Sequence, residues 1–264
     1  MACLFSAANL GAQCPSTPRG GITANPNRPT VADPADVGQL GVLELEYGWE
    51  RVWRGGAIHG NSFGALVKFA ALCNLEIRWS PDTLDTEGGQ RGLGDNRIGA
   101  QYRFRRQTAR LPALAASYAV TIPTASVRKG LGSGRADHQF KFLASKDVLG
   151  THFDFNASAL LIGRPSGRGF DRNAEIDLSS SHPLLGKLGL TGEIYGDTRL
   201  NGEAPGFAST LWALTYGITP RLVVDAGVDV ALTPDAPHHK RFVMGFVYSL
   251  GELYRRLRRH TRIH

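Results

Sequence analysis

Apolar and polar residues alternate along most of this chain, and the alternation is clearest over residues 92–104. Read in steps of two, one face is apolar and ends in Tyr102 and Phe104, and the other is polar and carries Arg97 and Arg103. Because successive side chains of a strand point to opposite faces, the stretch predicts a strand with one apolar and one charged side. Such a strand fits a soluble sheet with one wet face, or a transmembrane barrel whose polar face lines the lumen.

The rest of the chain favours the barrel. Three glutamates, Glu44, Glu46 and Glu50, share one face of the first alternating stretch. Buried charges cost several kcal/mol each (~3–5), so this face needs water rather than a packed core. The pattern predicts twelve strands, an even number, with lengths near the ~9–11 residues that cross a bilayer at a tilt. They cover 41–53, 61–71, 73–80, 92–104, 113–122, 137–145, 152–162, 173–181, 187–195, 209–216, 222–232 and 241–250.

The connections between these strands alternate in length. Those after even-numbered strands are short, and those after odd-numbered strands are longer and rich in glycine or charge. Alternating short turns and long loops is typical of an up-and-down barrel with its short turns in the periplasm. The sequence therefore predicts an all-β fold, a single up-and-down antiparallel transmembrane β-barrel of about twelve strands. Both termini are expected in the periplasm and the barrel in the bacterial outer membrane, in contact with its lipid.

Composition agrees with this interpretation. Glycine is abundant, at 32 of 264 residues, and no run of 18 apolar residues provides a transmembrane helix. Barrel strands alternate, so their average hydropathy resembles that of a soluble protein. Cys3, Cys14 and Cys73 share no recognisable spacing and predict neither a disulfide framework nor a zinc site.

The chain divides into four expected parts. Residues 1–14 resemble the end of a secretory signal peptide, with a disordered tail as the alternative. Residues 15–38 are rich in Pro, Asn, Thr and Asp and are expected to form a linker or a plug. Residues 39–250 are the barrel. Residues 251–264 form a basic tail with five arginines, which accounts for most of the net charge of +7, so a nucleic-acid-binding face is not expected on the barrel.

The charged residues of the polar face are the candidate functional residues. They are expected to line the pore, either as an open, charge-lined channel or as ion-pair networks that fill a sealed interior. An acidic wall is expected around the first and eleventh strands, and a basic wall around the third and fourth. The predicted pore-lining residues are Glu44, Glu46, Glu50, Lys68, Glu76, Arg78, Arg97, Arg103, Lys141, Asp154, Glu175, Asp177, Glu193, Asp225, Asp229 and Arg241.

Other motifs predict no catalytic residue, metal site or cofactor. His238 and His239 are adjacent in a predicted loop and lack the spacing of a tetrahedral metal site. His152 and Ser158 share a strand face but lie about 20 Å apart at the usual rise per residue, too far for a nucleophile and its base. The glycine-rich stretches at 92–94 and 130–134 precede strands instead of helices, so a phosphate-binding loop is not expected.

Several segments, taken in order, resemble a known bacterial family. They are GQLGVLELEYGW (38–49), FAALCNLEIR (69–78), GLGDNRIGAQYRF (92–104), LAASYAVTIPT (114–124) and YGITPRLVV (216–224), and together they span most of residues 30–250. The family is labelled "putative MetA-pathway of phenol degradation" and is also called a transporter family. The resemblance implies an outer-membrane barrel associated with the uptake of aromatic or other small hydrophobic compounds. It supplies no catalytic residues.

The end of the predicted barrel departs from the usual pattern. Barrels of this kind commonly finish on an aromatic residue that marks the last strand for the barrel-assembly machinery, whereas Tyr248-Ser249-Leu250 is followed here by the basic tail. The hypothesis from sequence is a porin-like outer-membrane channel that passes small hydrophobic or aromatic solutes and is not an enzyme. The alternative is a structural or adhesive barrel with a sealed lumen.

Overall fold

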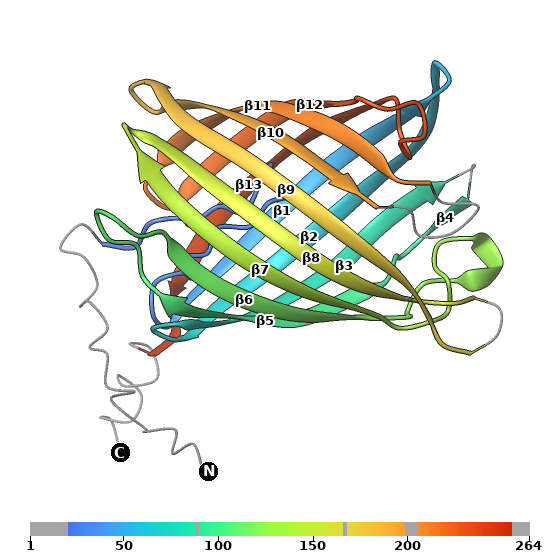
Figure 1. The fold of residues 1–264 in the computed structure, drawn as a ribbon, viewed down its shortest axis with the longest axis horizontal. Coiled ribbons are helices and arrows are strands. Elements are labelled where there is room, and N and C mark those ends of the chain that lie inside the picture. The colour runs from blue at the N-terminus through green and yellow to red at the C-terminus, as the bar shows by residue number, and fades with distance from the viewer. Residues whose placement is uncertain (1–20, 88–89, 166–167, 199–204, 255–264) are drawn as a thin grey trace, which may run out of the picture.

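The chain forms a closed antiparallel β-barrel (Figure 1). The computed structural model describes residues 21–87, 90–165, 168–198 and 205–254. Strands pair with their neighbours in chain order, and β1 (Val42–Arg54) pairs with both β2 (Ala57–Leu72) and β13 (Lys240–Glu252), which closes the circle. The remaining barrel strands are β3 (Leu75–Glu87), β5 (Asn96–Arg105), β6 (Ala113–Ile122), β7 (Asp137–Val148), β8 (Thr151–Gly163), β9 (Phe170–Leu185), β10 (Leu188–Asp197), β11 (Phe207–Thr219) and β12 (Leu222–Ala231).

The barrel wall has twelve strands, so the predicted fold class is confirmed. A thirteenth strand, β4 (Gln90–Gly92), pairs only with the end of β3 and is not part of the barrel wall. The 3₁₀ turn η1 (Val127–Lys129) lies in the connection between β6 and β7. Among the described residues, no helix is long and apolar enough to cross a membrane.

Two outer connections are shorter than the sequence predicts. The expected loops at 54–60 and 81–93 are largely strand, because β2 begins at Ala57 and β3 continues to Glu87. The backbone ladder between Gly60–Gly64 and Asp82–Glu87 continues beyond the stretch where side chains alternate clearly. Alternation arises where the two faces of a strand have different environments, so a stretch without clear alternation gives no signal for the strand that continues there.

Short turns gather at one end of the barrel, together with both ends of the described chain (Figure 1). Tight turns join β7 to β8 at Leu149–Gly150 and β9 to β10 at Gly186–Lys187, and Leu149, Gly150 and Gly186 all have positive φ. The turn between β2 and β3 contains Cys73, which is disulfide-bonded. The spacing of the cysteines predicts no disulfide framework and gives no signal for this bond.

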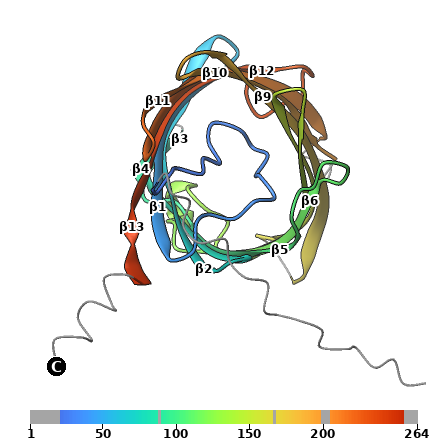
Figure 2. The same ribbon diagram turned by 90° about the vertical axis from the view of Figure 1, so that its left-hand side faces the viewer.

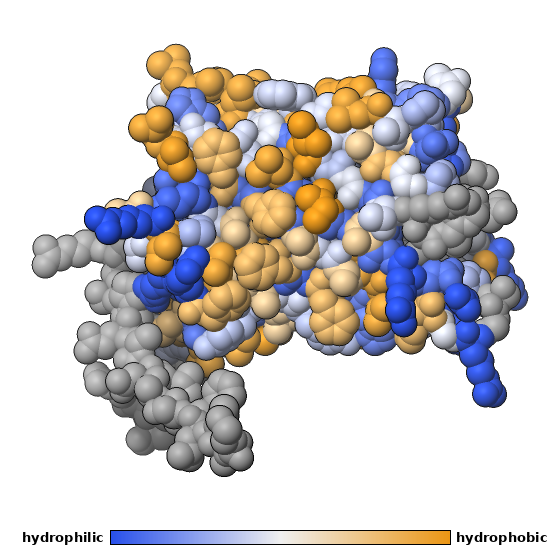
Figure 3. All heavy atoms as spheres, in the orientation of Figure 1, coloured by the Kyte–Doolittle hydropathy of each residue, from blue (hydrophilic) through white to orange (hydrophobic). Residues whose placement is uncertain are grey.

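The two faces of the wall differ in polarity as the alternation predicts. Large apolar side chains point outward and are exposed, for example Tyr102 at 42% and Trp212 at 58%. The flank of the barrel in Figure 3 carries most of the visible apolar side chains, and hydrophilic ones gather toward both ends. Lipid therefore takes the place of a protein core on the outside, and the buried polar side chains point inward.

Residues 21–41 lie inside the barrel. Figure 2 looks along the barrel and shows this segment, hereafter the inner segment, crossing the lumen before the chain enters β1. It contains no regular secondary structure apart from turns and bends. Its backbone N–H and C=O groups consequently need hydrogen-bond partners on the wall, and inward-pointing charged side chains provide many of them.

Candidate functional site

The charged residues expected to line the pore lie on the inward faces of their strands, and most of them contact either one another or the inner segment. The first group joins β1 to β2. Lys68 is 2% exposed, and its Nζ lies 2.8 Å from Glu44 and 2.5 Å from Glu46. The same ammonium donates to Asn27 Oδ1 of the inner segment. The two glutamates in turn accept hydrogen bonds from the backbone N–H groups of Asn25 and Asn27.

Arg28 of the inner segment neutralises part of the acidic wall. Its guanidinium forms a forked ion pair with Asp225 of β12, with both N–O distances 3.2 Å. The guanidinium lies over Gly48 and Gly245, which face each other across β1 and β13. A Cβ atom at either glycine would overlap it. Two inward glycines therefore provide the space in which this ion pair forms.

Glu193 of β10 binds the inner segment through its backbone. Its two carboxylate oxygens accept from the N–H groups of Val31 and Ala32, at 2.9 and 2.6 Å. On the opposite side of the lumen, Glu76 of β3 accepts from the Gly38 N–H at 2.9 Å. Inward carboxylates thus accept hydrogen bonds from backbone N–H groups of a segment that pairs with no strand.

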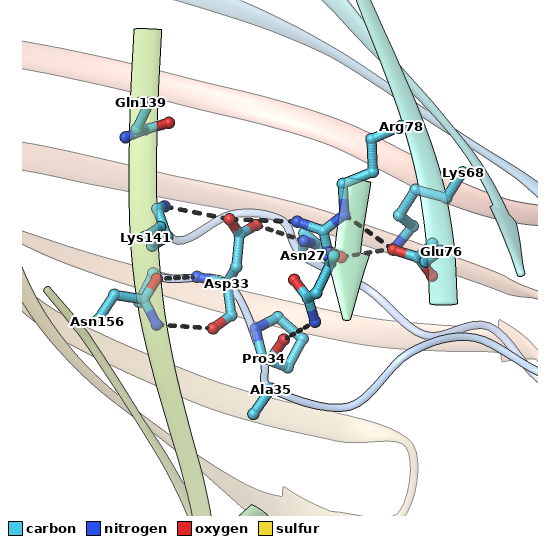
Figure 4. A network of polar contacts seen from close by, with 12 residues as sticks. Asn27, Asp33, Pro34, Ala35, Lys68, Glu76, Arg78, Gln139, Lys141 and Asn156 are labelled. Atoms are coloured by element: carbon cyan, nitrogen blue, oxygen red, sulfur yellow. Dashed lines mark hydrogen bonds and ion pairs between the residues drawn. The ribbon is translucent and has the colours of Figure 1, made fainter. Parts of the chain in front are cut away.

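Asp33 is the centre of the polar network in Figure 4. Its carboxylate lies 3.1 Å from Lys141 Nζ and 3.3 Å from Arg78 Nη1, and it also accepts from the side chain of Asn27. Burial raises the pKa of Asp33, but Lys141 and Arg78 lower it more, so the net pKa is well below its usual value. Asp33 is therefore ionised at neutral pH and holds two cations from opposite sides.

Uncharged wall side chains form hydrogen bonds with the backbone of the inner segment at residues 33–35. Asn156 bonds the backbone of Asp33 twice, accepting from its N–H at 2.7 Å and donating to its carbonyl at 2.9 Å. Gln101 donates to the Pro34 carbonyl at 2.9 Å, and Ser145 accepts from the Ala35 N–H at 2.7 Å. Ala35 also packs in a small buried cluster with Ala113, Ala115 and Leu143.

The last acidic residue of the inner segment pairs with the basic wall. Asp36 accepts from Arg103 at 2.5 Å, and Arg103 also donates to the carbonyl of Cys73. Arg78 donates its Nε to Glu76. The charges of the inner segment are therefore complementary to the two walls that the sequence predicts: Arg28 faces the acidic side, and Asp33 and Asp36 face the basic side.

Toward the long loops, a separate network surrounds Asp229 of β12. Asp229 accepts from Arg241 at 2.7 Å, from the Tyr195 hydroxyl at 2.5 Å and from His238 at 2.9 Å. Arg241 also donates to Glu50 at 3.1 Å. His238 comes from the loop between β12 and β13 and is 5% exposed, so this loop reaches into the lumen. The described residues include no group of His, Cys, Asp and Glu that could hold a metal ion.

Toward the turns, Asp154 accepts from Ser145 at 2.5 Å and contacts His152, whose other ring nitrogen contacts Asp147. Two carboxylates flank this histidine, and the serine hydroxyl donates to Asp154 rather than to the ring. That is not the order of a nucleophile and its base, and the arrangement supports no hydrolytic chemistry.

Glu175 and Asp177 of β9 stand apart from the inner segment. Glu175 accepts from Ser158 and more distantly from Gln139. Asp177 is fully buried, and neither of its oxygens has a hydrogen-bond partner among the described residues.

Two cavities lie on either side of the inner segment. The cavity toward the turns has a volume of about 510 Å³ and is lined by the segment at Arg28 and Pro34 and by the wall at His182 and Thr191. The cavity toward the loops, hereafter the loop-side cavity, has a volume of about 270 Å³. Val31 and Asp33 form its floor. The inner segment therefore separates two spaces within one lumen.

Sequence reasoning missed several residues of this site. Tyr195 shares the parity of Glu193, so the alternation alone places it inward. His238 sits in a loop, where no periodic signal exists. Arg28, Asp33 and Asp36 belong to an aperiodic segment, and nothing in their spacing indicates which wall residues they meet.

A family model described as "Putative MetA-pathway of phenol degradation" matches residues 23–238. The solved structure of an outer membrane channel from Pseudomonas putida F1 has a TM-score of 0.64 at 11% identity, covering 85% of this chain and 98% of that one. The NanC porin has a TM-score of 0.57 at 10% identity, covering 79% and 100%. The KdgM porin, solved in complex with disordered oligogalacturonate, has a TM-score of 0.57 at 9% identity, covering 79% and 99%. No curated protein matches.

These matches agree with the architecture and with the family resemblance. At such low identities the solved structures show the fold alone, which is that of outer-membrane channels and porins. The apolar outer face and the polar lumen belong to a barrel of the bacterial outer membrane. The family model covers more than half of the chain, and it confirms the family that the sequence segments resemble. The chain belongs to the family described as "Putative MetA-pathway of phenol degradation".

Proposed function

We propose that this barrel passes small hydrophobic or aromatic compounds across the outer membrane, along a path beside the inner segment. One observation carries the proposal: the lumen holds a cavity of about 510 Å³ lined by the inner segment at Arg28 and Pro34, and a second of about 270 Å³ lined by it at Val31 and Asp33. A barrel that served only as a scaffold would need no such spaces.

The way the inner segment is attached supports a path that opens. Its contacts with the wall are mostly hydrogen bonds and ion pairs made by wall side chains, such as the paired hydrogen bonds of Glu193 and of Asn156. It contributes no strand to the sheet. A shift of this segment therefore breaks none of the ladder that holds the barrel closed.

The alternative is a structural or adhesive barrel whose inner segment seals the lumen as a plug. The complementary charges support it, because Arg28, Asp33 and Asp36 each pair with a wall residue of opposite sign. The two readings differ in whether solute flux depends on the space inside the barrel.

That dependence can be measured with two matched variants on β8. Leu160 lines the loop-side cavity, and its neighbour Leu161 points outward. In porin-deficient cells that express the chain, Leu160→Trp should fill the cavity and lower the rate of labelled phenol uptake several-fold, whereas Leu161→Trp should leave it unchanged. Uptake equal to that of non-expressing cells for the wild type, or equal rates in both variants and the wild type, would favour the sealed barrel.

A further inference from the structure

We propose that the loop-side cavity is a binding site for a small aromatic carboxylate, with the carboxylate held by Arg97 and Arg78 and the ring held by aliphatic side chains. This inference rests on the proposed function and names a substrate class for it. A cavity of about 270 Å³ is below the ~300–1,000 Å³ typical of sites for drug-sized ligands, so it suits a single-ring compound.

The polar side of the cavity carries more positive than negative charge. Arg78, Arg97 and Lys141 line it, against Asp33 and Glu175. Lys141 and one nitrogen of Arg78 are already paired with Asp33. Arg78 also pairs with Glu76, which lies outside the cavity lining, so Arg97 is the lining cation that makes no ion pair among the described residues.

Arg97 has no carboxylate partner in the described part of the chain. Its Nη1 donates to Gln139 at 3.0 Å, and its Nε makes a long contact of 3.4 Å with Thr121. Both partners are neutral, and these contacts orient the guanidinium without neutralising it. A planar guanidinium held this way is suited to bind a carboxylate through two parallel N–H donors.

Arg78 contributes a second donor. Its Nε and Nη1 bond Glu76 and Asp33, but its buried Nη2 has no partner among the described residues. Arg78 and Arg97 lie on the paired strands β3 and β5, where Arg97 faces Ser80, two residues along the strand from Arg78. An anion beside Arg97 would therefore lie next to a cationic side chain that has one unused donor.

Aliphatic side chains also line the cavity. Leu66 of β2 and Leu160 of β8 point inward, against the alternation that places polar residues there, and Val31 of the inner segment lies on the same cavity. Inward leucines are out of place in a water-filled pore, since the lumen face of such a barrel is polar. They match the ring of an aromatic compound whose charged end meets the arginines.

The test is calorimetric binding to the purified full-length barrel in detergent, with benzoate and its neutral isostere benzamide as probes. Wild type should bind benzoate at least about tenfold more tightly than benzamide, because charge-assisted hydrogen bonds are roughly twice as strong as neutral ones. Arg97→Gln should remove that preference and leave benzamide binding unchanged, and Arg97→Lys should restore part of it. Arg105→Gln, on the same strand and outside the cavity, should bind both probes as wild type does.

Circular dichroism establishes that each variant is folded before its titration. Equal affinities of the wild type for the two probes would overturn the proposal, as would tight benzoate binding by folded Arg97→Gln. Failure here is separate from failure of the proposed function. If Leu160→Trp blocks phenol uptake while Arg97→Gln binds benzoate normally, the barrel transports aromatics without an arginine site for acids.

Discussion

At the scale of single residues, the ion pair between Arg28 and Asp225 depends on glycine. The guanidinium of Arg28 occupies the volume that a side chain would fill at Gly48 and Gly245. Two neighbouring strands thus leave a flat place on the inner wall, beside a carboxylate that is only 2% exposed in its side chain. The sequence shows these glycines, but only the structure shows which residue they accommodate.

Gly48→Ala should therefore displace Arg28 and leave Asp225 buried without its partner. Leaving a buried charged acceptor unsatisfied costs ~1–3 kcal/mol or more, so the free energy of unfolding should fall by about that amount in urea titrations of the folded barrel. Gly64→Ala is the matched control, since Gly64 also points inward but a Cβ there meets only Asp82 at 3.7 Å. Equal effects of the two substitutions would mean that Arg28 contributes nothing.

Lys68 is the most deeply buried cation of the wall. It forms ion pairs with both Glu44 and Glu46, and it is 2% exposed. Lys68→Met should leave two neighbouring carboxylates without a counter-charge and destabilise the barrel by about 3–5 kcal/mol, read from the shift in its urea midpoint. Lys187→Met, in an exposed turn, should change stability by no more than ~0.5 kcal/mol. A small effect at Lys68 would indicate that water in the lumen screens these charges.

At the scale of elements, the alternation predicted every strand of the wall, because lipid on one side and polar groups on the other impose a period of two. Strand ends were less predictable where no such contrast exists, as in the hairpin of β2 and β3 beyond the clear alternation. The conformation of the inner segment could not be predicted from its sequence. Residues 21–41 have no period, and their conformation is set by partners such as Glu193 and Asn156 that lie far away along the chain.

The outward face of β11 provides a test of strand orientation. Leu214 lies near the middle of that strand and is 48% exposed, so it should contact the acyl chains of the membrane. Leu214→Arg should destabilise the barrel in lipid by ~2–4 kcal/mol, whereas Leu232→Arg, just beyond the end of β12, should cost only ~0–1 kcal/mol. Unfolding in lipid vesicles measures both, and a neutral effect at Leu214 would mean that this face is inverted or shielded.

At the scale of the whole molecule, the sequence identified the family, the fold and the inward charges, but it left the state of the lumen open. The structure shows why the number and sign of the inward charges could not reveal whether the lumen is open or plugged. Acidic residues such as Asp225 and basic residues such as Arg103 belong to opposite walls, and their partners Arg28 and Asp36 come from the inner segment. The interior therefore consists of two charged walls and a segment that pairs with both of them.

The most direct test of this account is single-channel conductance in a planar bilayer, with the anchors of the inner segment intact and then removed. The comparison is between wild type and a variant that combines Asp33→Asn with Glu193→Gln, which weakens contacts to three strands of the wall while keeping side-chain size. Wild type should show a small conductance, because the inner segment separates the two cavities, and the variant should show larger or more frequent openings. A large wild-type conductance that the double substitution leaves unchanged would contradict the account, because the inner segment would then not control the lumen.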